Sequence, residues 1–465
     1  MVQLAAWLVL CLAIAWLLRN RVAYAIAVAI VVWAAVPALG GHHLTGLSGS
    51  GIAFHPATWL VLLTFVVQLV TNPLAIARVL GRHYLVVLSV LVFIAGAFIT
   101  SRFTASGGTR LLMDQIVAPF LLWLVVVAAG EGRREVLKVV RNAVLLGVAF
   151  QSVMALLQLA FDDVLLYAND YAQLDWFTPE QFHQRWMGTA DSPLVLSMAA
   201  CVAAALALSV RLPVWRFTLV GLYASAAVIT QSRTGVIVIG LVVVYAIIRS
   251  RMALWSRALA SIAVAGIAFY LLGSTLVAGV AGRFANDTGS TNARVLAFRF
   301  VADHWTEFLL TGQGLISSYT IARNAGLETS LENSFLMYAI DTGFLLATLY
   351  FGTQVVIVAR YGLAQLSVRG VTLAAGIGVL MQHSFSAVAF ANQSGTLIWA
   401  CLALVVVAWS LPLSNQPPVP LATSQRPRRH LRPTDAHPSG AQPADTDQPN
   451  VGAPAAVSAA TSSGS

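Results

Sequence analysis

Residues 217–248 read FTLVGLYASAAVITQSRTGVIVIGLVVVYAII, which is two apolar runs separated by a short polar turn. Neither run, 217–231 or 235–248, contains a charged side chain. Apolar runs of this kind are typical of helices embedded in a membrane. The turn between them, Gln231-Ser232-Arg233-Thr234, therefore places a guanidinium at the membrane surface.

The whole chain follows the pattern of this stretch. Its 465 residues are 58% hydrophobic and 10% charged, whereas a typical soluble protein has about 25% charged residues. The apolar runs are long and do not alternate with period two, which excludes a β-barrel. The composition predicts an all-α polytopic membrane protein.

The apolar runs predict about thirteen transmembrane helices. We expect these spans at 2–18, 22–39, 57–72, 84–99, 113–130, 142–161, 192–210, 217–231, 235–248, 258–280, 333–358, 370–388 and 395–411. They form one transmembrane domain, residues 1–412. Residues 413–465 are rich in Pro, Ser, Ala, Thr and Gly, and such a segment is expected to be a disordered tail because it cannot bury a core.

The basic residues predict the orientation. Nineteen of the 27 fall in alternate loops and in the tail, and that side is expected to be cytoplasmic. The N-terminus and the loops 162–191 and 281–332 are then extracytoplasmic. The net charge of +9 follows from this orientation and does not call for a nucleic-acid partner. The other eight basic residues oppose the bias, so each is a candidate for a specific contact: Arg102, Arg110, Arg185, Arg233, Arg283, Arg294, Arg299 and Arg323.

The predicted outer loop 162–191 interleaves acidic and aromatic residues. This mixture suits carbohydrate, because rings stack on sugar faces and carboxylates bind hydroxyls. It is equally typical of an interfacial aromatic belt with solvated acids. The residues are Asp162, Asp163, Tyr167, Asp170, Tyr171, Asp175, Trp176, Phe177, Glu180 and Trp186.

Two arginines of the predicted outer face are candidates for binding a phosphate. Arg233 could hold phosphate oxygens in a bidentate manner or anchor the chain to lipid headgroups. In the predicted amphipathic helix 292–309, Arg299 has Asp303 four residues on, which predicts a local ion pair. Arg294 has Phe298 at that position, so we expect it to be freer to meet a substrate anion, unless Asp287, which is close in sequence, neutralises it.

Glu332-Asn333-Ser334 lies where the chain re-enters the membrane. A carboxylate at this position suits a general base that acts on a sugar hydroxyl. The three residues also suit the N-terminus of a helix, with Asn333 or Ser334 as the cap. His304 and His383 are lesser candidates for the base.

The sequence shows no metal-ligand spacing, nucleotide-phosphate loop or Ser-His-Asp pattern. We therefore expect no metal and no cofactor. The three cysteines, Cys11, Cys201 and Cys401, lie inside apolar runs and are expected to be small core residues.

Four motifs resemble those of the O-antigen ligase/polymerase superfamily of bacterial membrane glycosyltransferases. They occur in the family's order between residues 185 and 346. They are Arg185-Trp186-Met187-Gly188-Thr189 followed by Asp191-Ser192-Pro193, then Ser232-Arg233-Thr234-Gly235, then Arg294 with Trp305 and Gly312-x-Gly314, and finally Glu332-Asn333 followed by Gly343.

The resemblance implies a GT-C-like fold and a metal-independent transfer of glycan from a polyprenyl-pyrophosphate donor. It implies that Arg233 and Arg294, with help from Arg185, bind the pyrophosphate, and that the residue at the Glu332 position activates the acceptor. Asn333, Gly314 and Gly343 are expected to support this site. The protein would work in the bacterial plasma membrane with its site on the extracytoplasmic face. A flippase or chain-length regulator is a candidate partner.

The chain departs from the family pattern at two positions. Glu332 stands where lipid A-core ligases carry His, which resembles the polymerase branch. Leu346 stands where a small or β-branched residue is usual. We therefore expect a polymerase that joins lipid-linked units, with a ligase acting on a lipid, wall or protein acceptor as the alternative. A secondary transporter is the alternative from another class, although transporters place charges near mid-bilayer, and the polar residues within these spans are mostly uncharged.

Overall fold

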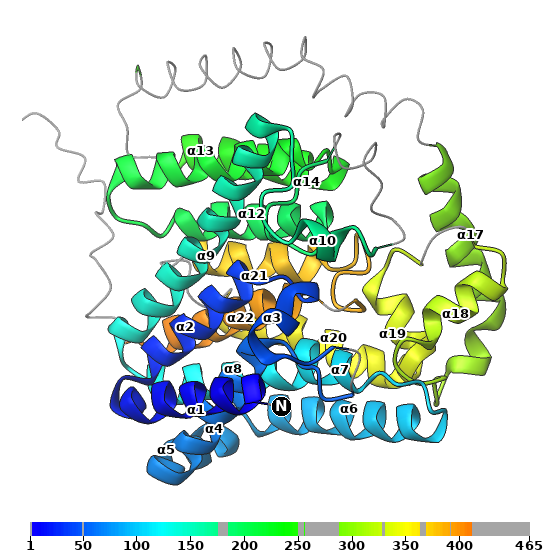
Figure 1. Ribbon diagram of the computed structural model, residues 1–465, viewed down its shortest axis with the longest axis horizontal. Helices are drawn as coiled ribbons and strands as arrows, with labels where there is room; N and C mark the ends of the chain where they lie inside the picture. Colours follow the sequence, from blue (N-terminus) through cyan, green and yellow to red (C-terminus); the bar gives the residue numbers. More distant parts are fainter. Residues whose placement is uncertain are drawn as a thin grey trace, which may run out of the picture. The chain divides into compact units, whose positions relative to one another are not determined.

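The computed structural model describes residues 2–48, 51–174, 185–249, 255, 288–327, 331–362, 369–390 and 392–411. These residues form helices joined by turns, with no strand among them (Figure 1). The predicted all-α class is confirmed. The predicted span 258–280, the tail 413–465 and parts of both predicted outer loops lie outside the described residues.

The helices of the first 171 residues are joined by short turns. Their bounds are α1 (Val2–Leu17), α2 (Val22–Ala35), α3 (His42–Thr45), α4 (Pro56–Thr71), α5 (Pro73–Arg82), α6 (Tyr84–Phe103), α7 (Thr109–Leu111), α8 (Ala118–Gly130), α9 (Arg134–Phe161) and α10 (Ala168–Tyr171). A π-helical turn, η3 (Leu112–Val117), joins α7 to α8.

The remaining described helices follow the loop that carries Arg185. Their bounds are α12 (Pro193–Ala207), α13 (Pro213–Ile229), α14 (Arg233–Ile248), α17 (Thr288–His304), α18 (Ser317–Asn324), α19 (Ser334–Thr342), α20 (Phe344–Ile357), α21 (Arg369–Met381) and α22 (Ser394–Ser410). Every predicted span that falls on described residues coincides with one or more of these helices.

The lengths of the helices are those of a multi-pass membrane protein. Among the described residues, four helices are long and apolar enough to cross a membrane, or up to six if each bent pair is one span. One such pair is α1 and α2, bent by 68° at the turn around Arg19. Five further apolar helices are shorter, with 10–17 residues. The count of thirteen spans therefore stays a prediction.

Helices α12 and α22 form the centre of the packing. Helix α12 contacts α9, α13, α14 and α21, and α22 contacts α8, α9 and α21. Every residue of α12 except Leu194 is buried, because its many alanines let neighbouring helices approach closely. Cys201 and Cys401 lie buried in these two helices as free thiols, as does Cys11 in α1. The predicted core role of the cysteines is confirmed.

The predicted span 333–358 is interrupted at Gly343, between α19 and α20. Gly343 has φ 101° and ψ 147°, a backbone conformation that is essentially restricted to glycine. The chain before α18 lies against this break, where Gln313 N–H donates to Ile340 O at 2.9 Å and Gly314 N–H donates to Asp341 O at 2.8 Å. The break thus lets a segment of the predicted outer loop pack against the end of an apolar helix.

Replacing Gly343 with alanine is expected to destabilise the protein by roughly 1–3 kcal/mol, the cost of one residue in a disallowed backbone region. A Cβ there would also lie 2.8 Å from the carbonyl oxygen of Leu310. Thermal unfolding in detergent measures the effect. Gly352→Ala in α20 is the matched control, since a Cβ at Gly352 meets nothing within 4 Å. Equal melting temperatures for the two variants would contradict the role of the break.

Candidate functional site

The segment between α21 and α22, residues 382–393 and here called the α21–α22 connection, is the centre of the candidate site. Its described residues form turns and bends. The predicted span 370–388 is therefore wrong at its C-terminal end, because α21 ends at Met381. The polar residues Gln382-His383-Ser384 begin the connection, and the carbonyl oxygens of His383 and Ser384 accept hydrogen bonds from the side chains of Asn333 and Arg294.

Arg294 and Glu332 form an ion pair beside this connection. Arg294 Nε lies 2.7 Å from Glu332 Oε2, and the two side chains are 38% and 22% exposed. Arg294 Nη2 also donates to the carbonyl oxygen of Ser384 at 3.3 Å. The expectation that Arg294 is freer than Arg299 is wrong, since its acidic partner is 38 residues along the chain and not on the same helix.

Glu332 is held in an unusual backbone conformation. Its φ is 47°, in the left-handed region that non-glycine residues rarely adopt. Such strain persists where the surrounding contacts determine it, often at functional sites. The next residue is the N-cap of α19, so the turn at Glu332 leads into that helix while its carboxylate contacts Arg294 of α17.

Asn333 caps α19 and also fixes the connection. Its Oδ1 accepts hydrogen bonds from Phe335 N–H at 2.9 Å and Leu336 N–H at 3.2 Å, which confirms the predicted N-cap. Its Nδ2 donates to His383 O at 3.0 Å. Ser334 Oγ donates to Phe385 O at 3.2 Å. The start of α19 and the connection therefore form one hydrogen-bonded unit.

Arg185 lies against the turn that carries Arg233. Arg185 Nε donates to Thr230 O at 3.1 Å, and Trp186 N–H donates to Ile229 O, with 3.4 Å between nitrogen and oxygen. Arg233 is the first residue of α14, whose cap is Ser232. The structure thus brings together the chain segments of two arginines that the sequence predicts for pyrophosphate binding.

The α21–α22 connection contacts Arg294 near one end and the loop that carries Arg185 at the other. Ser384 and His383 contact Arg294 and Asn333 as described above. At the other end of the connection, Gln393 Nε2 donates to Thr189 O at 3.3 Å, four residues after Arg185. The Arg294–Glu332 pair and the loop of Arg185 thus both pack against the α21–α22 connection.

The loop 185–192 is fixed by side chains from the interior. Gln158 forms two hydrogen bonds with Gly188, one from Nε2 to the carbonyl oxygen at 2.9 Å and one from Gly188 N–H to Oε1 at 2.7 Å. Thr189 Oγ1 donates to Ala34 O at 2.7 Å. Gly188 has φ 62°, and a Cβ there would collide with the carbonyl oxygen of Gln151. Gly188 and Thr189 therefore fix the loop that carries Arg185.

Asp341 is a buried acid next to the candidate site that the sequence analysis missed. It is fully buried and accepts hydrogen bonds from Ile316 N–H at 3.0 Å, Ser318 N–H at 2.7 Å and Ser317 Oγ at 3.1 Å. It therefore holds the segment around Gly314, which has φ 87°. Asp341 is the one charged residue between 333 and 358, and this feature of the sequence could have identified it as a candidate.

The packing corrects the expectation for Arg299. Arg299 is exposed, and in the described part of the chain it forms no ion pair with Asp303 or Glu307. The departure from the family pattern at Leu346 is matched by a glycine that faces it: a Cβ at Gly96 would collide with the end of the Leu346 side chain. The larger side chain is thus accommodated by a smaller one on α6.

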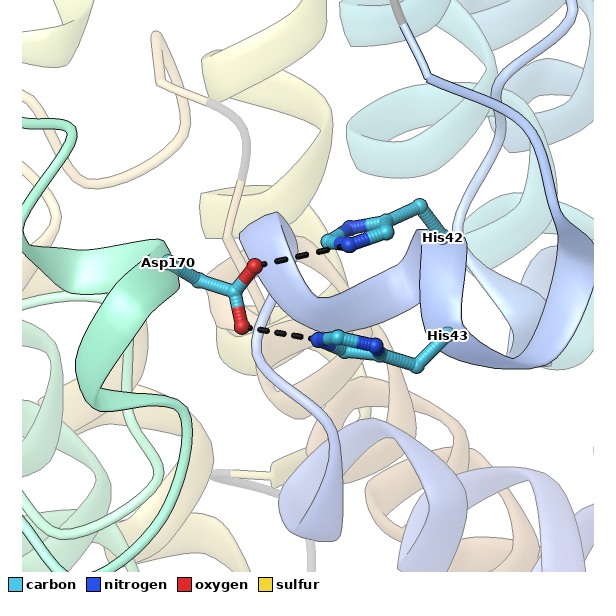
Figure 2. A group of neighbouring side chains, drawn as sticks. All are labelled: His42, His43 and Asp170. Carbon is cyan, nitrogen blue, oxygen red and sulfur yellow. Dashed lines mark hydrogen bonds and ion pairs between the residues drawn. The ribbon is translucent and has the colours of Figure 1, made fainter.

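The acidic and aromatic residues of loop 162–191 do not form one exposed face. Tyr171 and Trp186 are buried, with 0% and 1% exposure, and Tyr171 Oη donates to Ala190 O at 3.0 Å. Asp170 instead lies between two histidines that the sequence analysis did not single out, His42 and His43 (Figure 2). Asp175, Trp176, Phe177 and Glu180 lie outside the described residues.

Asp191, just before α12, is a buried acid. Burial raises the pKa of its carboxyl to about 7, although Ala38 N–H donates to Oδ1 at 2.7 Å. The folded state therefore retains a proton that the unfolded chain loses near pH 4. The contribution of this group to stability is fully present below about pH 4 and is lost as the pH rises through about 7.

Replacing Asp191 with asparagine should remove this pH dependence. From pH 5 to pH 8, we expect the free energy of unfolding of Asp191→Asn to rise relative to wild type by about 2–3 kcal/mol, because a single retained proton changes it by about 1.4 kcal/mol per pH unit. Unfolding in detergent at several pH values measures the difference. Asp163→Asn, an exposed acid of the same loop, is the control. A difference that does not change with pH would contradict the assignment.

Comparison with known families bears on the same part of the chain. No curated protein matches the chain. A family model described as O-Antigen ligase matches residues 217–351, which include Arg233, Arg294, Glu332 and Gly343. The match confirms the resemblance of this part of the chain to the O-antigen ligase/polymerase superfamily.

Proposed function

We propose that this protein is a membrane glycan polymerase. It transfers a glycan from a polyprenyl-pyrophosphate carrier to a sugar hydroxyl of another lipid-linked unit. The reaction takes place on the extracytoplasmic face of the bacterial plasma membrane, with the C-terminal tail in the cytoplasm. Glycan transfer of the O-antigen ligase/polymerase type is supported by the family match, and the polymerase assignment is the further step.

The contact between Arg294 and Glu332 is the observation that carries the proposal. A charge-assisted hydrogen bond of 2.7 Å fixes the orientation of the carboxylate. The pair is only partly buried, so an acceptor could reach it. Helix α17 meets the start of α19 beside the α21–α22 connection. This contact brings the guanidinium of Arg294 and the carboxylate of Glu332 together.

The reaction needs both groups. Glu332 accepts the proton of the acceptor hydroxyl, whose oxygen attacks the anomeric carbon of the donor sugar. The bond from that carbon to the pyrophosphate oxygen breaks, and the polyprenyl pyrophosphate leaves with the electron pair. Arginines beside the leaving group stabilise its negative charge. We assign this role to Arg294 and Arg233, with Arg185 in support.

The metal-independent character of the transfer belongs to the same proposal. Guanidinium groups can bind phosphate oxygens in a bidentate manner, so they can supply the positive charge at the pyrophosphate. Asn333, Gly314 and Gly343 support the site indirectly, since they fix the start of α19, the turn before α18 and the break before α20.

A ligase is the second candidate. The description of the matching family model favours it, whereas Glu332 in place of His favours the polymerase. The two differ in product: a polymerase makes long lipid-linked glycan, and a ligase moves glycan to a final acceptor. A secondary transporter would make neither product.

Single substitutions at the site test the proposal. In cells that depend on this protein, Glu332→Gln, Arg233→Ala and Arg294→Ala should each shorten the lipid-linked glycan, with a rate loss of about 100-fold or more for the base, as is typical of general-base catalysis. Gel analysis of glycan length measures this. Arg299→Ala is the matched control, because Arg299 lies exposed on the same helix, α17, as Arg294.

Three outcomes of this experiment are informative. Wild-type glycan length in all three variants at normal protein level would refute the site. Loss of acceptor-bound product while long lipid-linked glycan accumulates would identify a ligase. Unchanged glycan synthesis with loss of uptake or export of a solute would identify a transporter.

Exchanging the two charges separates a catalytic pair from a structural one. The double variant Arg294→Glu with Glu332→Arg keeps an ion pair and is expected to recover most of the thermal stability lost in each single variant. It should remain inactive, because the base and the cation have changed places. Recovery of glycan synthesis in the exchanged variant would show that the pair is merely structural.

A further inference from the structure

A group of metal-ligating side chains lies outside the site described above. His42 and His43 belong to α3, and Asp170 belongs to α10. Both imidazole rings point toward the Asp170 carboxylate (Figure 2), with His43 Nε2 at 2.9 Å from Oδ2 and His42 Nε2 at 3.5 Å from Oδ1. The three ligand atoms, one from each residue, all lie within 4.8 Å of one another.

The backbone selects the tautomer of His42 that a metal site needs. His42 Nδ1 lies 2.9 Å from the carbonyl oxygen of Leu39. A carbonyl oxygen can only accept, so Nδ1 carries the hydrogen, and in the neutral ring Nε2 presents its lone pair to Asp170. A hydrogen bond from the non-ligating nitrogen to a backbone carbonyl is a usual feature of a metal-bound imidazole.

The chain segments around α3 and α10, which supply the ligands, are packed closely. A Cβ at Gly40 would lie 2.6 Å from the ring of Tyr167. The Tyr167 ring also lies 5.9 Å from that of His43, and Tyr167 itself has φ 60° at the start of α10. The approach of the loops is thus set by contacts around the group and not by the three polar side chains alone.

The exposed fractions of the three side chains also favour a bound cation. The Asp170 side chain is 8% exposed, whereas those of His42 and His43 are 36% and 54% exposed. A shielded carboxylate is costly unless a cation or hydrogen-bond donors compensate it. In its neutral form, His42 turns a lone pair, not a donor, toward this carboxylate. A cation bound between the three groups removes that repulsion and compensates the charge of Asp170.

A polar cavity lies beside the three side chains. Its volume is about 320 Å³, and its lining includes His42, Asp170, Gln173 and Arg110. Arg110 is fixed there because its Nη2 donates to Ala38 O at 2.6 Å. An ion held by the three ligands would keep its remaining positions toward this cavity, where water or an oxygen ligand can reach it.

We propose that His42, His43 and Asp170 bind one divalent transition-metal ion, with Zn²⁺ as the ion that fits best. Two imidazole nitrogens and one carboxylate oxygen suit zinc, which binds them at about 2.0–2.2 Å, whereas Mg²⁺ and Ca²⁺ prefer oxygen ligands. The ion joins the short helices α3 and α10 beside the cavity. This site is separate from Glu332 and Arg294, so the proposal does not rest on the proposed glycan transfer.

Zinc binding by the full-length protein tests the proposal directly. The protein in lipid nanodiscs is stripped with a chelator, and ZnCl₂ is titrated against a competing zinc indicator. We expect one tight equivalent per chain, with metal content confirmed by mass spectrometry after desalting. Substituted Co²⁺ should give visible absorption bands typical of imidazole and carboxylate ligands.

Substitutions locate the ion. His42→Ala, His43→Ala and Asp170→Asn should each weaken zinc binding by more than about 100-fold, beyond the 10–100-fold typical of losing an outer-shell partner. His304→Ala is the matched control, since His304 Nδ1 makes the same kind of contact, 2.8 Å to Phe300 O, and it should leave binding unchanged. Size-exclusion profiles and melting temperatures show whether each variant is folded.

His43→Ala serves if the other variants fail to fold, because the His43 side chain is more than half exposed. Zinc binding that persists in folded His43→Ala, or wild-type protein that binds no zinc at about 100-fold excess over protein, would overturn the proposal. In the second case the three side chains are a histidine–aspartate hydrogen-bonded group. Neither result affects the glycan-length test of Glu332.

Discussion

The hydrogen-bonded ion pair between Arg294 and Glu332 is the constraint around which the candidate site is arranged. It joins α17 to the start of α19, and Arg294 also contacts the α21–α22 connection. Because the Arg294 side chain is more than a third exposed, the pair contributes about 1 kcal/mol or less to stability, as solvent-exposed pairs do. The pair matters because of its position: it brings a carboxylate and a guanidinium together at one point of the structure.

Buried polar side chains fix the loops around the site by binding their backbone groups. Gln158 binds both backbone groups of Gly188, and Asp341 binds the backbone around Ile316. A polar group inside a membrane protein is costly unless it finds a partner. Each of these side chains finds it in the backbone of a loop, and each loop is thereby held in one conformation. The glycines of the motifs also fix the loops: Gly188, Gly314 and Gly343 adopt positive φ angles. The charged residues of the same motifs lie elsewhere along these segments.

The family match, the apolar helices and the charged residues agree on one class of protein but not on one product. In the proposed reaction on the outer face, an enzyme of this type needs an activated donor that is already in the membrane, because no nucleotide sugar is available there. The arginines are suited to a pyrophosphate and the carboxylate to a hydroxyl.

The sequence by itself determined the all-helical class, the burial of the cysteines and the helix start at Asn333-Ser334. These follow from local composition, because a run of apolar residues or a side chain next to a helix start acts over a few residues. The tertiary structure decided the partners. Arg294 pairs with Glu332, 38 residues away, and Asp170 meets His43 across 127 residues. No spacing rule reaches such distances, since packing brings these segments together. The same reason explains the end of α21 at Met381, where the following polar residues find hydrogen bonds with the start of α19 that no local pattern could show.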